Sequence, residues 1–117
     1  MNKKLILMIL ASVVLSQSAI AADANAGKTF FSQPCGLCHT AEPNDNGGAQ
    51  GPSLQGIFDR AAASGTFSYS QALSSANLTW DADTLDSFLA NPTTTVPGSS
   101  MVVPVLNGTD RENVIAY

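Results

Sequence analysis

The sequence predicts an all-α fold of three main helices joined by long irregular connections. Three segments carry apolar residues at helical spacing, and none shows the apolar–polar alternation that is typical of paired strands. The connections between them are rich in glycine, proline and asparagine, which favour turns. The chain has 117 residues, a length that favours one domain. Loops this long in a small domain usually wrap around something or carry function.

The first predicted helix covers residues 23 to about 33. Asp23 lies near its start, and Gly27, Phe30 and Phe31 fall on one face at helical spacing. Pro34 has no backbone N–H to donate, so we expect the end of this helix to kink or loosen.

The second main helix is predicted over residues 81–90. It ends at the Asn91-Pro92 pair, because the residue before a proline is disfavoured in helical geometry. Three apolar side chains share one of its faces: Leu85, Phe88 and Leu89. Upstream, residues 67–76 predict a short helical segment.

The last helix is expected to open at a capping box formed by Thr109 and Glu112. Its apolar side is predicted to carry Val114, Ile115 and Tyr117. The composition of residues 41–53 predicts a loop, and residues 93–104 are expected to be extended and rich in turns.

Residues 1–21 have the layout of a secretory signal peptide. Lys3 and Lys4 give a positive start, an apolar run follows, and Ala19-Ile20-Ala21 forms a small-x-small cleavage site. The apolar run is shorter than the roughly 20 residues of a membrane span, and an uncleaved N-terminal anchor is the alternative. No cysteine precedes Cys35, which excludes a lipid-modified N-terminal cysteine. We therefore expect export, most simply to a bacterial periplasm, of a mature domain covering residues 22–117.

Removal of this leader would leave an acidic protein. Three basic residues, Lys28, Arg60 and Arg111, would face nine acidic ones, which is a net charge of −6. Such a chain has few positive charges with which to neutralise phosphates, so we expect no nucleic-acid partner.

Both cysteines and the only histidine of the chain lie within one short motif, Cys35-Gly36-Leu37-Cys38-His39. A disulfide between such close cysteines would close almost no loop and stabilise little. A thioredoxin-like dithiol belongs at a helix start in a strand–helix pattern, and a zinc site needs a fourth ligand. We favour a third interpretation, covalent haem. In it the two thiols add to the haem vinyl groups and His39 binds the iron.

Met101 is the predicted second ligand of that iron. Met1 and Met8 would leave with the signal peptide, so Met101 would be the only methionine of the mature chain. A methionine usually fills a gap in an apolar core. This one lies in a stretch shaped by Pro97-Gly98 and Pro104, which favours a ligand loop in a haem protein. Ligation by histidine and methionine raises the reduction potential and leaves no open coordination site.

From about Asp23 to Tyr117 the chain resembles the class I cytochromes c, of the mitochondrial and bacterial c₂ type. The resemblance rests on motifs that occur in order: CGLCH, GPSLQGIF, FSYSQAL, LTW, FLANP, VPGSSM and VIAY. It implies a compact all-α fold around one covalently bound haem c, with His39 and Met101 as axial ligands. It also implies single-electron transfer as the function, by a carrier and not an enzyme.

The resemblance implies roles for residues outside the haem motif. Gly27 and Phe31 match positions that pack against the last helix, where Val114 and Tyr117 match. Pro52 matches a proline whose carbonyl accepts the free N–H of the ligating histidine.

The haem propionates are expected near a further set of residues. Tyr69, Trp80 and Ser99 match positions that hydrogen-bond the propionates, and Arg60 matches a nearby arginine. Without the resemblance, Tyr69 and Trp80 would more often be ordinary core aromatics.

Several positions depart from the family pattern. Phe88 stands where a tyrosine often bonds the methionine sulfur, and Leu73 stands where an asparagine is common. Both changes remove polar groups from the expected haem site. The family's last helix normally continues about one turn beyond Tyr117, so the resemblance implies a truncated last helix.

The expected partners are redox proteins, such as a membrane oxidase, a reductase or a periplasmic dehydrogenase. Mitochondrial-type carriers present a ring of lysines to acidic partners, whereas Lys28 is the only lysine of the mature chain and Ser100 replaces a common lysine. We therefore expect a partner docking surface that is basic or largely apolar. The rival function is a haem sensor or gas-binding protein in which Met101 is not bound and the sixth site is open.

Overall fold

The computed structural model describes residues 20–117 and is helical with long connections, as predicted. Almost all of the predicted leader lies outside these residues. Within residues 20–117 there is no strand, and two isolated bridges pair Thr40 with Ser53 and Ala61 with Thr79. The helices are α1 (Ala24–Phe30), the π-helix η1 (Phe31–Cys35), α2 (Gln71–Ser74), α3 (Ala82–Ala90), α4 (Pro92–Thr95) and α5 (Gly108–Ala116).

The first helix changes register at its C-terminal end. Asp23 caps α1, and its carboxylate accepts hydrogen bonds from the N–H groups of Asn25 and Ala26. The expected loosening at Pro34 takes the form of the wider π-helix η1, which extends helical backbone beyond the expected end to Cys35. Pro34 offers no N–H to the Thr29 carbonyl five residues earlier, and the Ser32 hydroxyl donates to that carbonyl instead at 2.7 Å.

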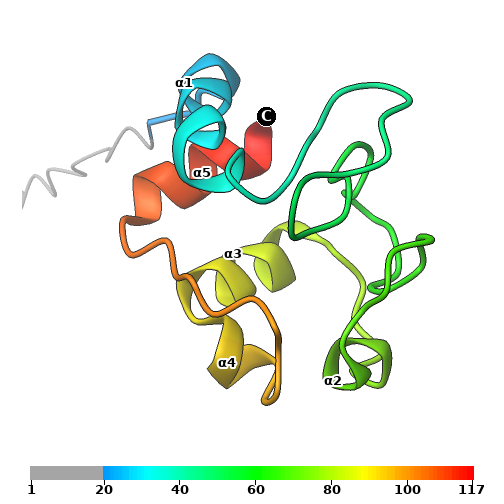
Figure 1. Cartoon of the computed structure of the whole chain (residues 1–117). Coiled ribbons are helices and arrows are strands. Elements are labelled where there is room, and N and C mark those ends of the chain that lie inside the picture. The colour runs from blue at the N-terminus through cyan, green and yellow to red at the C-terminus, as the bar shows by residue number, and fades with distance from the viewer. Residues whose placement is uncertain (1–19) are drawn as a thin grey trace, which may run out of the picture.

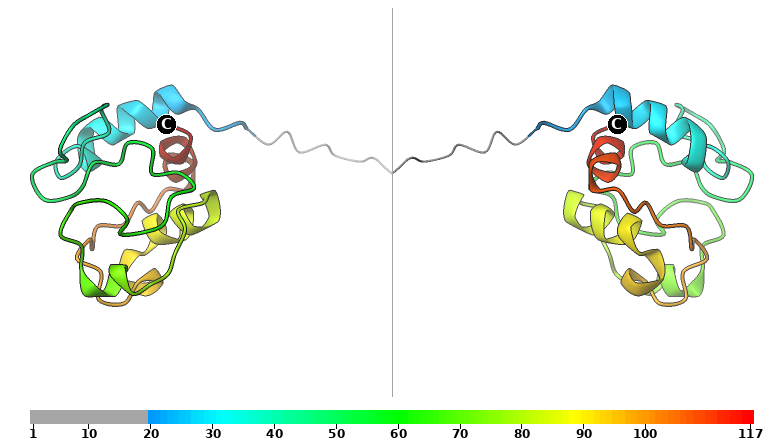
Figure 2. Two further views of the ribbon diagram at one scale, coloured as in Figure 1. Left: turned by 90° about the vertical axis from the view of Figure 1, so that its right-hand side faces the viewer. Right: turned by 90° about the vertical axis from the view of Figure 1, so that its left-hand side faces the viewer.

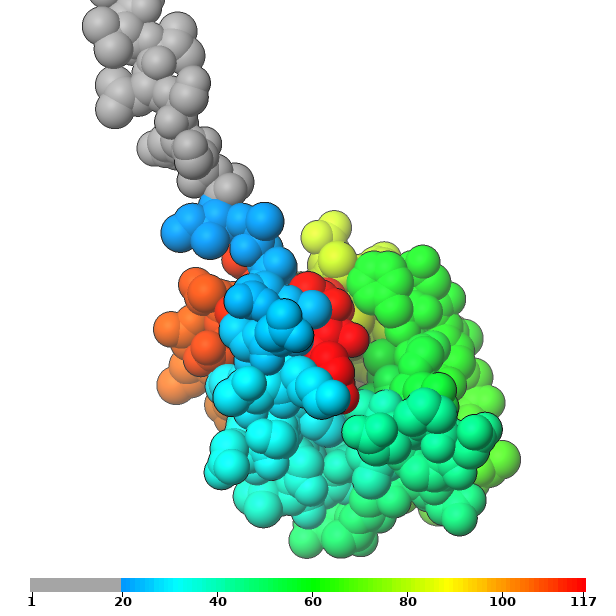
Figure 3. Space-filling view, turned by 90° about the horizontal axis from the view of Figure 1, so that it is seen from above, coloured from blue at the N-terminus to red at the C-terminus, as the bar shows by residue number. Residues whose placement is uncertain are grey.

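Helices α1 and α5 cross with their backbones in contact at Gly27. A Cβ atom there would overlap the backbone carbonyl of Asn113, so the close approach depends on glycine. The space-filling view in Figure 3 shows α1 lying directly over α5. At the end of the contact, the rings of Phe31 and Tyr117 pack at a centroid distance of 5.6 Å. The predicted packing of the first helix on the last is confirmed.

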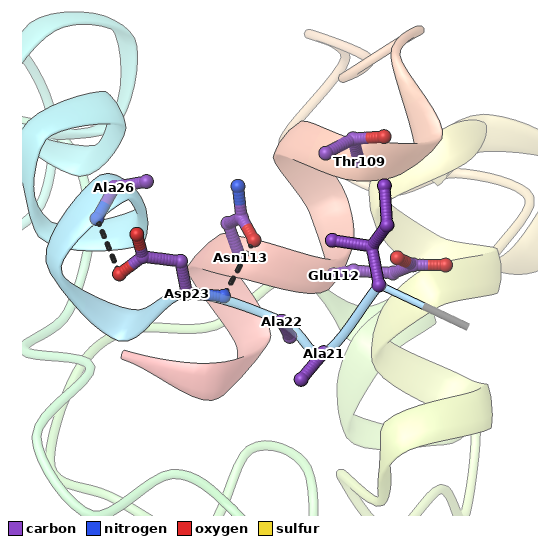
Figure 4. Close-up of a pocket in the computed structure, with 8 residues that line it drawn as sticks. Ala21, Ala22, Asp23, Ala26, Thr109, Glu112 and Asn113 are labelled. Carbon is purple, nitrogen blue, oxygen red and sulfur yellow. Dashed lines mark hydrogen bonds between the residues drawn. The ribbon is translucent and has the colours of Figure 1, made fainter. Parts of the chain in front are cut away.

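A polar clasp joins the start of α1 to α5. The Asp23 N–H donates to Asn113 Oδ1 at 2.8 Å, next to the bond from the Ala26 N–H to the Asp23 carboxylate (Figure 4). A small cavity of about 160 Å³ lies beside this clasp, between residues 20–26 and the first turns of α5. It holds none of the cysteine, histidine or methionine side chains.

Two predicted helix boundaries need correction. The last helix is capped by Asn107 and not Thr109, because the Asn107 side chain reaches the Asp110 N–H and starts the helix at Gly108. Pro92 ends α3 as expected, but it also begins the one-turn helix α4 within a stretch expected to be extended. Proline is well suited to a first helical position, because its missing N–H would be unpaired there anyway.

The three longest helices and the irregular segment of residues 40–70 lie on different sides of the molecule. Figures 1 and 2 show α1, α3 and α5 grouped on one side, with residues 40–70 looping along the other. The buried core between them is small: Trp80, Phe88 and Val96 form one cluster, against which Met101 packs. The Trp80 and Phe88 rings meet edge to face at 5.1 Å. A core this small leaves room for a large cavity.

Candidate functional site

One cavity of about 500 Å³ lies between the helical side and the looped side of the molecule. Its wall is built from η1, residues 50–70, α3 and residues 99–105. All nine residues that the sequence predicts for haem binding and iron ligation line it: Cys35, Cys38, His39, Pro52, Arg60, Tyr69, Trp80, Ser99 and Met101. Segments far apart in the chain are thus brought to one site.

The two cysteines lie at the end of η1 and in the turn that follows. The N–H groups of Cys38 and His39 both donate to the Cys35 carbonyl, at 3.1 and 2.9 Å, which winds the motif into one tight turn. Burial raises the pKa of the Cys35 thiol. A dithiol redox centre depends on the opposite shift, so the environment of Cys35 speaks against that alternative.

His39 is held by one hydrogen bond and one glycine. Its Nδ1 lies 2.9 Å from the Pro52 carbonyl oxygen, which is the contact that the resemblance implies. When Nδ1 carries the proton and donates, Nε2 is left free to bind a metal. A Cβ atom at Gly51 would overlap the imidazole ring, so glycine makes the space in which the ring lies.

The loop that carries Gly51 and Pro52 is organised by Asp45. Its carboxylate accepts from the Thr40 hydroxyl and from the N–H groups of Glu42 and Gly47. These bonds, led by the one from Thr40, lower the pKa of the Asp45 carboxyl below its ordinary value of 3.8. The loop composition predicted an irregular segment, but it did not identify Asp45 as the group that folds it.

Replacing Asp45 with asparagine is expected to lower the melting temperature at pH 7. Because the folded-state pKa of Asp45 lies below its unfolded value, the stabilisation is complete above pH 3.8 and is lost as the pH falls further. The melting-temperature gap between wild type and Asp45→Asn should therefore shrink below that pH. Asp59→Asn is the matched control, since the Asp59 carboxylate makes no hydrogen bond within residues 20–117. A gap that does not depend on pH would contradict this account.

Met101 reaches the cavity from an extended segment between α4 and α5. Its side chain is half-buried and packs against the cluster of Trp80, Phe88 and Val96. Ser99 shapes the turn before it: the Ser99 N–H donates to the Val96 carbonyl, and its hydroxyl donates to the Met101 carbonyl at 2.9 Å. The hydroxyl proton of Ser99 is therefore committed to the backbone, and reaching a propionate would require breaking that bond.

The remaining predicted residues keep free donors. The Tyr69 hydroxyl accepts from the Gly65 N–H at 3.2 Å, which leaves its own proton available. The Trp80 indole N–H, on a side chain only 5 % exposed, has no hydrogen-bond partner within residues 20–117. Arg60 donates only weakly, to the Gln55 carbonyl at 3.4 Å, and pairs with no carboxylate in the described part of the chain. Among residues 20–117, Arg60 is the only one that gives the cavity wall a full positive charge.

Much of the remaining wall is apolar and was predicted only in part. Phe88, Leu85 and Leu89 of α3 face the cavity as the shared face predicted, and Leu73 joins them. Ile57 also lines it, from a segment without periodicity that would have marked it. No aspartate, glutamate or lysine of residues 20–117 lines the cavity. The site is therefore a largely apolar cavity with one cationic side chain, Arg60.

Comparison with known proteins agrees with the cysteine–histidine motif and this cavity. Residues 24–117 match the cytochrome c family. The chain belongs to the cytochrome c family. Cytochrome c₂ of Rhodomicrobium vannielii is 40 % identical over 114 residues, covering 96 % of this chain and 90 % of its own. Cytochrome c of Gossypium barbadense is 38 % identical over 103 residues, covering 86 % and 92 %.

A solved structure extends this likeness from sequence to fold. Cytochrome cH from Methylobacterium extorquens superposes with a TM-score of 0.72 at 37 % identity, covering 82 % of this chain and 96 % of that one. Like the other members, this cytochrome c is an electron carrier and not an enzyme, and its CxxC motif implies covalent haem c. The predicted family, all-α fold and cofactor are confirmed.

The residues present fit a haem. The cavity volume of about 500 Å³ falls within the roughly 300–1,000 Å³ that is usual for cofactor sites. Two thiols, one imidazole with a fixed ring and one thioether line the same apolar wall. The described part of this cytochrome c holds no group of three or more His, Cys, Asp or Glu side chains placed to share a metal ion. None of the helices in residues 20–117 is both long and apolar enough to cross a membrane.

Proposed function

We propose that the mature chain, residues 22–117, is a soluble periplasmic one-electron carrier whose haem iron is bound by His39 and Met101. One observation carries the proposal: both side chains line a single cavity together with Cys35 and Cys38. Cytochromes of this family carry electrons, and the leader-like residues 1–21 support export. The haem supplies the one-electron couple of its iron.

The residues of this chain have separate tasks in that proposal. Cys35 and Cys38 attach the cofactor, and the Pro52 carbonyl orients the ring of His39. Met101 would be the second protein ligand of the iron and would leave no site for an external ligand. The apolar wall excludes water, which limits how far the surroundings reorganise when the charge changes.

Arg60, Tyr69 and Trp80 would hold the haem propionates. All three line the cavity; Arg60 makes no ion pair within residues 20–117, and the Tyr69 hydroxyl and the Trp80 indole have protons to donate. Hydrogen bonds between charged groups and such donors are stronger than neutral ones. The Ser99 hydroxyl donates to the Met101 carbonyl and so helps to hold the segment that carries Met101. If this hydroxyl donated to a propionate, it would lose its hydrogen bond to the Met101 carbonyl.

Visible spectra of the protein produced with haem-attachment machinery test the ligation. We expect a low-spin c-type spectrum with a weak long-wavelength sulfur–iron band, and no change when CO is added to the reduced protein. A high-spin spectrum that shifts with CO would show that Met101 is off the iron, and would make a gas-binding or sensing protein the better assignment. Fractionation of the producing cells tests the periplasmic location separately.

The docking surface of the partner is basic or largely apolar in this proposal. The nine carboxylates of the chain all lie outside the cavity wall, and the wall carries no lysine. An apolar side chain is exposed within the haem motif, since Leu37 is 75 % exposed, whereas the exposed Val102 and Val103 line the cavity itself. Leu37 lies between two lining cysteines without lining the cavity itself, so its exposure does not depend on what fills the cavity.

Salt dependence of electron transfer tests this docking surface. With an acidic-patch oxidase, we expect the rate to rise or stay level as ionic strength increases from about 0.01 M to about 0.15 M, because a mature chain of charge −6 is repelled by such a patch. A lysine-rich mitochondrial-type cytochrome c, measured with the same oxidase, is the control and should slow down. If the electron-transfer rate of this protein also fell as ionic strength rose, the protein and the acidic patch would attract each other, and the proposed docking surface would be wrong.

A further inference from the structure

Arg111, on α5, connects three parts of the fold. Its Nε donates to Asp86 Oδ1 on α3 at 2.7 Å, and its Nη1 donates to the backbone carbonyls of Val105 and Leu106 at 3.0 and 3.1 Å. The Arg111 side chain is only 17 % exposed, whereas the Asp86 side chain is 44 % exposed, so water screens the ion pair in part and the bond to the Val105 carbonyl is the better protected contact. Within residues 20–117 this is the only ion pair.

The two carbonyls that Arg111 bonds lie at the end of the segment that carries Met101. We call residues 97–104 the methionine strap. Val96 precedes the strap and is 2 % exposed, and Val105 follows it and is 8 % exposed. The Val105 N–H donates to the Leu89 carbonyl of α3 at 2.8 Å. Each end of the strap is therefore anchored, the first end by Val96 and the last by Val105 with Arg111.

Between its ends the methionine strap has little support of its own. Its hydrogen bonds are the two local ones of Ser99, to the Val96 and Met101 carbonyls. In the described part of the chain, no hydrogen bond joins residues 100–104 to any helix. The position of Met101 consequently depends on the two anchors and on its packing against the core cluster.

We propose that Arg111 is a positioning residue that keeps Met101 on the haem iron by holding the last end of the methionine strap. This inference rests on the proposed His39 and Met101 ligation. The planar guanidinium bonds Asp86 through Nε while Nη1 bonds the two carbonyls that directly follow the strap, an arrangement that a single ammonium group cannot reproduce. Without it the Val105 and Leu106 carbonyls lose a charged donor, and the strap reaches conformations in which the Met101 sulfur has left the iron.

The test compares CO binding by the reduced holoprotein in wild type and Arg111→Gln. We expect the CO-binding fraction to increase about tenfold in the variant, because the two charge-assisted hydrogen bonds that anchor the last end of the strap, to the Val105 and Leu106 carbonyls, are lost. The long-wavelength sulfur–iron band of the oxidised form should weaken in parallel. Arg111→Lys keeps the positive charge but loses the several N–H groups of the guanidinium. We expect this variant to bind less CO than Arg111→Gln but more than wild type.

A second variant separates positioning from general stability. The ring of Phe31, at the start of η1, packs against the ring of Tyr117, at the end of α5. Phe31→Leu weakens this contact and changes no residue of the methionine strap. Each protein is measured at the same number of degrees below its own melting temperature. Under that condition the reduced Phe31→Leu variant should not bind CO. An equal opening in both variants would mean that lost stability, not lost positioning, releases Met101, and would overturn the inference.

The remaining outcomes also decide. A wild type that is closed to CO, together with an Arg111→Gln variant that is equally closed, overturns the role of Arg111 and leaves the proposed ligation intact. A wild type that binds CO freely overturns the ligation and the role of Arg111 together.

Discussion

Replacing Met101 with alanine is expected to turn the closed carrier into a CO-binding haem protein. Met101 is the only methionine beyond residue 8, and its side chain lines the cavity with His39. Alanine has no sulfur to offer, so the sixth position opens. The reduction potential should fall by on the order of 100 mV, because methionine ligation raises it and axial ligands are its main determinant. Potentiometry and CO titration of the reduced protein measure both effects.

The control for this change is Leu106→Ala. Leu106 is 82 % exposed, does not line the cavity and lies just beyond the methionine strap. This variant should keep the wild-type potential and stay closed to CO. If Met101→Ala also kept the wild-type potential, Met101 would not be the ligand.

Gly27→Ala is expected to destabilise the protein by about 3 kcal/mol, a typical upper value for overpacking a close contact. Helix propensity alone predicts the opposite, since alanine is favoured over glycine in a helix by about 1 kcal/mol. The overlap of the new Cβ with the Asn113 carbonyl outweighs that gain, because a backbone group of α5 cannot move aside without separating the helices. Urea unfolding of the holoprotein measures the difference.

Gly108→Ala provides a matched glycine-to-alanine control in the other helix of the pair. A Cβ atom at Gly108 would lie 3.5 Å from an Arg111 nitrogen, which is an ordinary contact. We expect this variant to change stability by less than about 0.5 kcal/mol. Comparable losses in the two variants would show that the crossing at Gly27 is not the reason for the effect.

Helix positions were predictable where the start signal and the apolar face agree. Residues 81–90 have both, and α3 begins after Asp81, whose carboxylate accepts from the Thr84 N–H. At the last helix the capping-box pattern selected Thr109, but Asn107 lies two residues earlier and caps the helix instead. Asparagine is favoured over threonine at an N-cap, so the residue types alone would have supported Asn107.

The register of the first helix shows a second limit. Periodicity over residues 23–33 predicted a helix, and Pro34 predicted its loosening, but neither distinguishes a π-helix from an irregular end. The result matters for the site, because η1 carries helical backbone to Cys35 and so fixes where the haem motif starts.

The candidate site was predictable because its chemistry is concentrated in a few residue types. Cys35 and Cys38 stand out by their spacing, and His39 and Met101 stand out because each is the only residue of its type in the predicted mature chain. Support residues gave no such signal. Arg111 pairs with Asp86 across 25 positions, and Asp45 organises its loop through short bonds that composition does not reveal. Such partners are chosen by tertiary packing, which the pattern of one sequence does not specify.

The ligation of the iron by Met101 is tested most directly by NMR of the reduced protein labelled with ¹³C in the methionine methyl groups. If the leader is removed, Met101 is the only labelled residue and gives one signal. The account predicts that the haem ring current shifts this signal far upfield of free methionine. A single signal at the ordinary methionine position would place the Met101 sulfur away from the iron and contradict the account.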